Sequence, residues 1–176
     1  MKGLVVSLLF MACVGVMAEP SQVIVVRHAE RALEPKADPV LSSEGQQRAV
    51  LLADTLARAN VQAIITTQYR RTQETAAPLA KRLGIMPTVI TTRRGELPEH
   101  IAEVVAAVRR NSGVVLVVGH SNTVSNLVAE LSGSTPLPLC ETSFAHVFVI
   151  ASATPHLPAL QLQYGAPDPV PTHGCQ

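Results

Sequence analysis

Aromatic residues are scarce in this chain: Phe, Trp and Tyr make up 3% of its 176 residues, and Trp is absent. The core must therefore be built mainly from Val, Leu, Ile and Ala, which is the composition of buried parallel strands covered by helices. The scarcity also argues against a platform on which nucleic-acid bases could stack. We accordingly expect an α/β domain rather than an all-β sandwich.

The chain also has no large excess of positive or negative side chains. The chain has 14 Lys and Arg against 13 Asp and Glu, so no global field attracts a polyanion such as a nucleic acid. Arginine pairs occur at 70–71, 93–94 and 109–110, and we interpret most of them as solvated helix ends. No nucleic-acid partner is expected.

The chain also lacks an apolar run long enough to span a membrane. Its longest run, Leu4 to Met17, follows Lys2 and overlaps Val16 and Ala18, which are spaced like a cleavage site. Residues 1–18 are therefore predicted to be a signal peptide cleaved after Ala18. The mature protein would be periplasmic or secreted, without stable membrane insertion, and an uncleaved anchor is the alternative.

Cysteine is rare, with three residues in the chain. Cleavage after Ala18 would remove Cys13 and leave Cys140 and Cys175. Export would place these two residues where disulfides persist. Spacing alone does not distinguish a Cys140–Cys175 disulfide from two free thiols.

The remaining sequence alternates between strand and helix patterns, at a length that suits one domain. Strands are predicted at 22–26, 63–65, 87–91 and 114–118, helices at 44–59, 72–83, 98–110 and 123–131, and a hairpin at 144–150 and 157–164. This order predicts a three-layer αβα sandwich whose mostly parallel central sheet ends in a C-terminal antiparallel edge hairpin. The domain would span 19–164, and the Pro-rich residues 165–176 would form a tail.

Cationic residues follow three of the predicted strands. Arg27 and His28 end the first strand, Arg71 follows the second, and His120 follows the fourth. The carboxyl ends of parallel strands meet at one edge of a sheet, where ligands bind. Guanidinium groups there favour a tetrahedral oxyanion such as phosphate. Imidazoles add groups that can accept a phosphoryl group or exchange a proton near neutral pH.

Signatures of a bound cofactor are missing. There is no GxGxxG or P-loop glycine pattern, no HxxxH and no cysteine pair at metal-ligand spacing. A metal site using His28 and His120 is the competing interpretation, and it finds little carboxylate nearby except Glu30. We expect a site that needs neither a metal nor an organic cofactor.

Four segments resemble the histidine phosphatase superfamily, branch 1, also called phosphoglycerate mutase-like. They are VVRHAE, LSSEGQQRA, TTQYRRTQETA and VVGHSNTV, in that order, and the likeness spans about 23–150. The resemblance, to a small exported bacterial type, implies a metal-independent hydrolase of phosphomonoesters. In it, His28 would become phosphorylated and Arg27, Arg71 and His120 would bind the phosphoryl oxygens. Arg71 is preferred to Arg70 because the family spacing fits Thr67, Arg71 and Thr75.

The same resemblance implies an acid that protonates the leaving group. Glu96 is the first candidate by position, and Glu99 and Glu30 are the alternatives. Arg31, three residues past His28, is a candidate contact to substrate.

No long insertion between strands could form a lid, so the crevice is expected to be open to a phosphorylated small molecule or macromolecule. Two other functions stay open: a phosphohistidine protein phosphatase, and a catalytically inert phosphate-binding module on the same fold. Neither the natural substrate nor the oligomeric state follows from the sequence.

Overall fold

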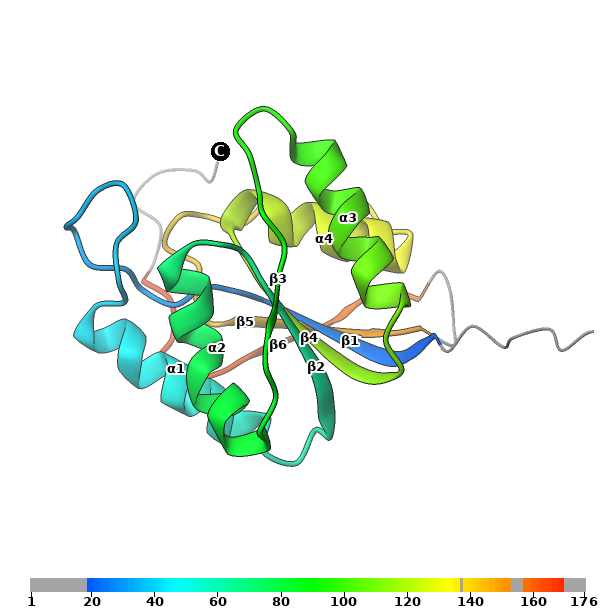
Figure 1. Ribbon diagram of the computed structural model, residues 1–176, viewed down its shortest axis with the longest axis horizontal. Coiled ribbons are helices and arrows are strands. Elements are labelled where there is room, and N and C mark those ends of the chain that lie inside the picture. The colour runs from blue at the N-terminus through cyan, green and yellow to red at the C-terminus, as the bar shows by residue number, and fades with distance from the viewer. Residues whose placement is uncertain (1–18, 137, 153–156, 170–176) are drawn as a thin grey trace, which may run out of the picture.

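A mixed sheet with helices on both faces forms the centre of the protein (Figure 1). The computed structural model describes residues 19–136, 138–152 and 157–169. Along them the elements are β1 (Pro20–Arg27), α1 (Ser43–Thr55), β2 (Val61–Thr66), α2 (Arg70–Leu83), β3 (Thr88–Val89), α3 (Leu97–Arg109), β4 (Gly113–Gly119), α4 (Ser121–Ser132), β5 (His146–Ala151) and β6 (Leu160–Gln163). The expected signal peptide, 1–18, lies outside the described residues.

The strands form a single six-stranded sheet in the order β3-β2-β4-β1-β5-β6. The pairs β1 with β4, β4 with β2 and β2 with β3 are parallel. β5 runs antiparallel to β1, and β6 runs antiparallel to β5 at the sheet edge. The predicted αβα sandwich, with a mostly parallel sheet and a C-terminal antiparallel edge hairpin, is confirmed.

β1 divides the core into two halves. Its Val23 and Val25 pack with α3 and α4 on one face of the sheet, whereas Ile24 and Val26 pack with α1 and α2 on the other. Successive side chains of a strand point to opposite faces. The uninterrupted apolar run of β1 is therefore what a central strand covered on both sides requires.

The helix boundaries follow recognisable local signals. The side chain of Ser42 caps α1 by accepting a hydrogen bond from the backbone N–H of Gly45 at 3.2 Å. A Cβ atom on Gly45 would lie 2.0 Å from the carbonyl oxygen of Glu30, so α1 packs against the backbone after β1 too closely for a side chain. Gly84 ends α2 with φ +66°, as expected. No helix of the described segments is long and apolar enough to cross a membrane.

Several elements are shorter than predicted, among them β6, which comprises Leu160–Gln163 rather than 157–164. α1 ends at Thr55 rather than at 59, because the next residues form turns. β3 comprises Thr88–Val89 rather than 87–91, and it lies at the edge of the sheet, where β2 is its one partner. The short β3 leaves the residues before α3 as a loop.

The first residues of the predicted C-terminal tail pack on the domain. Asp168 accepts hydrogen bonds from the backbone N–H groups of Phe144 and Ala145 at 2.7 and 2.9 Å. Arg48 of α1 donates to the carbonyl of Ala166 at 3.0 Å. These contacts attach the chain after β6 both to α1 and to the loop that precedes β5.

The same loop contains Cys140, which is disulfide-bonded. Cys175 lies outside the described residues, so a pairing between the two stays a prediction.

Candidate active site

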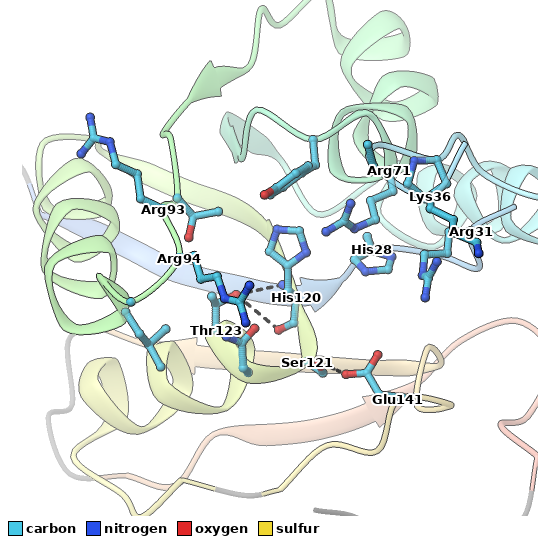
Figure 2. A pocket seen from close by; sticks show the side chains of 17 residues that line it. His28, Arg31, Lys36, Arg71, Arg93, Arg94, His120, Ser121, Thr123 and Glu141 are labelled. Atoms are coloured by element: carbon cyan, nitrogen blue, oxygen red, sulfur yellow. Dashed lines mark hydrogen bonds between the residues drawn. The ribbon is translucent and has the colours of Figure 1, made fainter. Parts of the chain in front are cut away.

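The carboxyl ends of β1, β2 and β4 meet beside a cavity of about 610 Å³ (Figure 2). Of the site residues predicted from sequence, His28, Arg31, Arg71 and His120 line it. The full lining is His28, Arg31, Lys36, Ala37, Pro39, Tyr69, Arg71, Thr92, Arg93, Arg94, Gly95, Leu97, His120, Ser121, Asn122, Thr123 and Glu141. One cavity thus collects groups that lie more than 100 residues apart in the sequence.

His28 is held with one ring nitrogen available for reaction. Its Nδ1 donates a hydrogen bond of 2.8 Å to the carbonyl oxygen of Ala29. A carbonyl can only accept, so Nδ1 carries the ring hydrogen and Nε2 of the neutral imidazole keeps its lone pair. The backbone N–H of His28 donates to the carbonyl of Gly119 at 2.9 Å, which continues the pairing of β1 with β4 past the end of the strand.

The surroundings of His28 also keep it neutral. The residue is 4% exposed, and burial, with further contributions from the charges of Arg27, Arg71 and Arg31, lowers the pKa of His28 from 6.5 to about 3. A neutral imidazole with an unshared electron pair on Nε2 is the nucleophilic form. His28 is therefore in that form throughout the physiological pH range.

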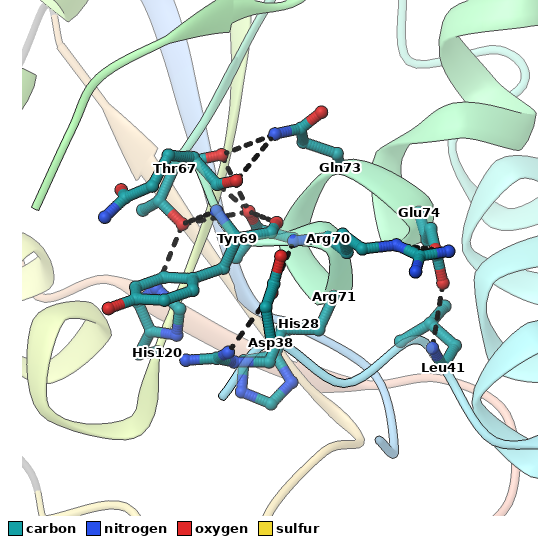
Figure 3. A network of polar contacts seen from close by, with 12 residues as sticks. His28, Asp38, Leu41, Thr67, Tyr69, Arg70, Arg71, Gln73, Glu74 and His120 are labelled. Atoms are coloured by element: carbon teal, nitrogen blue, oxygen red, sulfur yellow. Dashed lines mark hydrogen bonds and ion pairs between the residues drawn. The ribbon is translucent and has the colours of Figure 1, made fainter. Parts of the chain in front are cut away.

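His120 lies next to His28 and is the other neutral tautomer, with its ring hydrogen on Nε2. The two ring centroids lie 5.3 Å apart, and a chain of hydroxyl groups fixes the tautomer of His120 (Figure 3). The hydroxyl of Thr72 donates to the carbonyl of Tyr69 at 2.9 Å. The hydroxyl of Thr67 must then donate to Thr72 Oγ1, at 3.0 Å. Having used its hydrogen, Thr67 accepts one from Nε2 of His120, at 3.1 Å.

His120 is thus a neutral imidazole at the edge of the cavity, with its one ring hydrogen donated to Thr67. Burial, followed by the positive charge that His28 and Arg71 can carry, lowers the pKa of His120 to about 3. That ring hydrogen is donated to Thr67, so a further donor from the His120 ring requires protonation at Nδ1. The backbone N–H of His120 donates to Thr123 Oγ1 at 2.8 Å, and the residue caps α4, whose N-terminus lies at the cavity.

Arg71 projects into the cavity from the first turn of α2 (Figures 2 and 3). Its guanidinium carbon lies 4.2 Å from the centre of the Tyr69 ring. Its nearest carboxylate is that of Asp38, with a long Nη1 to Oδ1 distance of 3.9 Å. No hydrogen bond of the Arg71 guanidinium is found within the described part of the chain, so its donors remain open to an anion.

Thr75 joins this helix to the segment that carries His28. Its hydroxyl donates to the carbonyl of Arg71 at 2.7 Å and accepts from the backbone N–H of Ala29 at 2.9 Å. The spacing of Arg71 and Thr75, noted in the sequence, therefore has a structural reason. Thr75 sets the position of the start of α2 relative to the end of β1.

Arg27 differs from the other predicted phosphate ligands because it is not among the residues that line the cavity. It is 3% exposed. Its Nη1 donates to the carbonyl of Cys140 at 2.8 Å, and its Nη2 binds Glu141 Oε2 at 2.7 Å. Its guanidinium carbon lies 4.4 Å from the centre of the Phe144 ring. Arg27 thus organises the loop of residues 140–144, and Glu141 connects it to the cavity.

None of the three glutamates considered as the acid lines the cavity. Glu96 pairs with Arg93 at 3.2 Å on the surface, and Glu30 pairs with Arg48 at 2.7 Å. Glu99 is exposed in the first turn of α3. Their positions in the sequence made these glutamates candidates, but their side chains do not line the cavity that contains His28 and His120.

The one carboxylate in the cavity lining is that of Glu141. Its Oε1 accepts a hydrogen bond from the hydroxyl of Ser121, and its Oε2 binds Arg27. Partial burial opposes ionisation of Glu141, but the Ser121 hydrogen bond and the Arg27 charge outweigh it and lower its pKa. Glu141 is therefore an anion at neutral pH. No sequence motif pointed to Glu141, because its position in the cavity depends on how the 140–144 loop folds onto Arg27.

Further cations in the lining had no predicted role. Arg93 and Arg94 lie in the loop between β3 and α3 and line the cavity, so they are not the helix end that their pairing suggested. Lys36 reaches the cavity from the loop after β1. Among the described residues no cluster of three or more His, Cys, Asp or Glu side chains could hold a metal ion.

Part of the chain matches a known protein family. Residues 23–97 match the histidine phosphatase superfamily (branch 1). The matched segment contains His28 and Arg71, two of the residues that line the cavity. A search of curated protein sequences finds no significant match.

Solved structures extend the likeness to the histidine phosphatase fold as a whole. The protein histidine phosphatase SixA complexed with tungstate is 21% identical, with a TM-score of 0.60 over 81% of this chain and 95% of that one. A mycobacterial glucosyl-3-phosphoglycerate phosphatase with inorganic phosphate is 16% identical, with a TM-score of 0.55 over 85% and 97%. A phosphoserine phosphatase of Entamoeba histolytica with 3-phosphoglyceric acid is 13% identical, with a TM-score of 0.61 over 82% and 96%. At these identities the likeness establishes the fold.

Proposed function

We propose that this protein is a metal-independent phosphatase that hydrolyses phosphomonoesters through a phosphohistidine on His28. The observation that carries the proposal is the buried, neutral imidazole of His28 beside His120 and Arg71 in one cationic cavity. His28 presents a lone pair on Nε2, and the ring centroid of His120 lies 5.3 Å from that of His28. Arg71 supplies charge-assisted donors at the same cavity.

The proposed reaction has two steps. In the first, Nε2 of His28 attacks phosphorus in line, a bond from nitrogen to phosphorus forms, and the bond from phosphorus to the leaving oxygen breaks; the leaving oxygen keeps the electron pair and takes a proton from water. Arg71 and the N-terminus of α4 stabilise the charge on the phosphoryl oxygens, and His120 does so once the bound anion has favoured its protonation at Nδ1. In the second, water attacks the phosphohistidine, inorganic phosphate leaves and His28 returns to its neutral form.

Glu141 is proposed to accept the proton of the attacking water in the second step. It is the carboxylate of the cavity lining, and its lowered pKa keeps it in the basic form. Glu96, paired with Arg93 at the surface, is not assigned this or the leaving-group role. Comparison of Glu141→Gln with Glu96→Gln tests the assignment.

Hydrolysis of para-nitrophenyl phosphate by wild type and His28→Ala tests the main proposal. Loss of the nucleophile removes the covalent route, so we expect kcat to fall by about three orders of magnitude or more. Labelling with substrate carrying ³²P should give an acid-labile, base-stable phosphoenzyme in wild type and none in His28→Ala. His146→Ala is the matched control, because His146 lies on β5 and does not line the cavity.

Two results would reject the phosphatase. Equal activity of wild type and His28→Ala would exclude His28 as the nucleophile. Phosphate binding without turnover in either protein would favour the inert phosphate-binding module instead.

A phosphohistidine protein phosphatase is the second candidate function. The described cavity lining offers an ionised Glu141 and no neutral carboxylic acid to protonate a leaving alcohol. A phosphorylated imidazole that already carries a ring proton leaves without such help. The likeness in fold to the protein histidine phosphatase SixA is compatible with this use. A higher kcat/KM for a phosphohistidine peptide than for a phosphoserine peptide of the same sequence would favour it.

We further propose that the mature protein is exported after cleavage following Ala18. The disulfide at Cys140 supports this proposal, because disulfides persist in oxidising compartments. Amino-terminal sequencing of the protein recovered from periplasm or medium tests it.

A further inference from the structure

The cavity is larger and more cationic than one phosphoryl group requires. Its volume of about 610 Å³ is in the range that holds a whole small molecule. Besides Arg71, which faces the histidines, four cationic side chains line it: Arg31, Lys36, Arg93 and Arg94. The part of a substrate that does not react must therefore lie among positive charges.

These cations stand in two groups on opposite sides of the histidines (Figure 2). Arg31 and Lys36 lie on the side of Arg71, whereas Arg93 and Arg94 lie on the other side. A phosphoryl group bound by His28, His120 and Arg71 would be held between the two groups. Arg93 and Arg94 are then available to bind a different part of the ligand.

The charge of Arg94 is not neutralised within the described part of the chain. No ion pair there involves Arg94, whereas its neighbour Arg93 is paired with Glu96. The carboxylate of Glu141 is engaged by Arg27 and Ser121. An exposed arginine beside other cations attracts an anion, and its planar donors fit a phosphate group.

The loop that carries Arg94 is anchored at its base. The Gln68 side chain donates to the carbonyl of Thr92 at 2.8 Å and accepts from the Thr92 N–H at 2.9 Å. Gly95, with φ +86°, makes the turn that follows. Arg94 thus projects from a short segment held on one side by Gln68 and on the other by α3. Such support reduces the conformational entropy lost when the arginine binds a ligand.

We propose that the cavity binds a second phosphate group of the same substrate, held by Arg94, while the scissile phosphate lies between His28, His120 and Arg71. This inference rests on the proposed function for the identity of the scissile group. It narrows the substrate class to small phosphomonoesters that carry at least two phosphates. Hydroxyl and amide groups of Ser121, Asn122 and Thr123 line the same cavity and can complete the subsite.

Calorimetric titration with non-hydrolysable ligands tests the subsite without requiring turnover. The probes are α,ω-alkane bisphosphonates of increasing length and alkyl monophosphonates matched in length. We expect one bisphosphonate length to bind at least tenfold more tightly than its monophosphonate, a difference of about 1.4 kcal/mol. The twofold statistical advantage of a symmetric ligand is too small to produce this result.

Arg94→Gln should remove that preference, so that mono- and bisphosphonate bind within about threefold of each other. Arg58→Gln is the matched control, because Arg58 is an exposed arginine outside the cavity, and it should keep the wild-type ratio. Equal affinity of the two ligand classes in wild type, or a preference that survives Arg94→Gln, would overturn the subsite.

The two proposals fail in distinguishable ways. A bisphosphonate preference lost in Arg94→Gln, together with no hydrolysis of para-nitrophenyl phosphate, would support the subsite and reject the phosphatase. Hydrolysis that depends on His28, without any bisphosphonate preference, would support the phosphatase and reject the subsite.

Discussion

Replacing His28 with Asn should make the protein's stability less sensitive to acid. In the unfolded chain the imidazole of His28 takes up a proton below its ordinary pKa of 6.5, whereas in the native protein its pKa is about 3. Between these values the unfolded state binds more protons than the native state. The free energy of unfolding contributed by this group is therefore complete above pH 6.5 and is lost as the pH falls toward 3.

The size of the effect follows from the width of this window. One pH unit inside it changes the free energy of unfolding by about 1.36 kcal/mol for each proton. Acidification from pH 6.5 to 5 should thus remove about 2 kcal/mol through His28 alone, a large part of the 5–15 kcal/mol typical of a domain. Asn does not titrate, and its amide can still donate to the carbonyl of Ala29 in place of Nδ1.

Urea unfolding followed by far-ultraviolet circular dichroism is the suitable assay, because the chain has no tryptophan to report by fluorescence. Wild type and His28→Asn should be measured at pH 7.5, 6 and 5. The difference between their unfolding midpoints should shift by about 1 M urea in favour of the variant between pH 7.5 and 5. His120 titrates in both proteins, so the comparison isolates His28. Parallel pH profiles would refute a buried, neutral His28.

Two further predictions concern Glu141 and the amino terminus. In Glu141→Gln, kcat for para-nitrophenyl phosphate should fall by about 10²-fold and the ³²P-labelled phosphoenzyme should accumulate, because water loses its base; Glu96→Gln should stay within about threefold of wild type, and the reverse order would return the role to Glu96. Amino-terminal sequencing of exported protein should begin at Glu19, whereas an intact Met1 recovered from the membrane fraction would indicate an uncleaved anchor.

The sequence was sufficient to predict that His28, Arg71 and His120 lie together. His28 and His120 directly follow strands β1 and β4, and Arg71 lies at the start of the helix after β2. Right-handed connections between parallel strands bring their carboxyl ends to one sheet edge, whatever the details of packing. The convergence of these three side chains is therefore a consequence of strand order, which apolar patterns reveal.

Side chains that depend on packing were not predictable in the same way. Arg27 immediately precedes His28 yet is directed to the 140–144 loop, where Cys140, Glu141 and Phe144 contact its guanidinium. Adjacent residues at the end of a strand point to opposite sides. Which of them meets the ligand depends on what the neighbouring loop covers.

The amino-acid sequence by itself determined the α/β architecture. It also determined that His28, His120 and Arg71 meet at the carboxyl edge of the sheet, because both features follow from apolar periodicity and the order of strands. Tertiary structure alone decided that Glu141, rather than Glu96, is the carboxylate in the cavity. It also decided that Arg94 lines the same cavity. These residues lie on loops whose paths are set by long-range contacts, such as that of Arg27 with Glu141 and that of Gln68 with Thr92. Contacts of this kind form between distant segments and leave no local pattern in the chain.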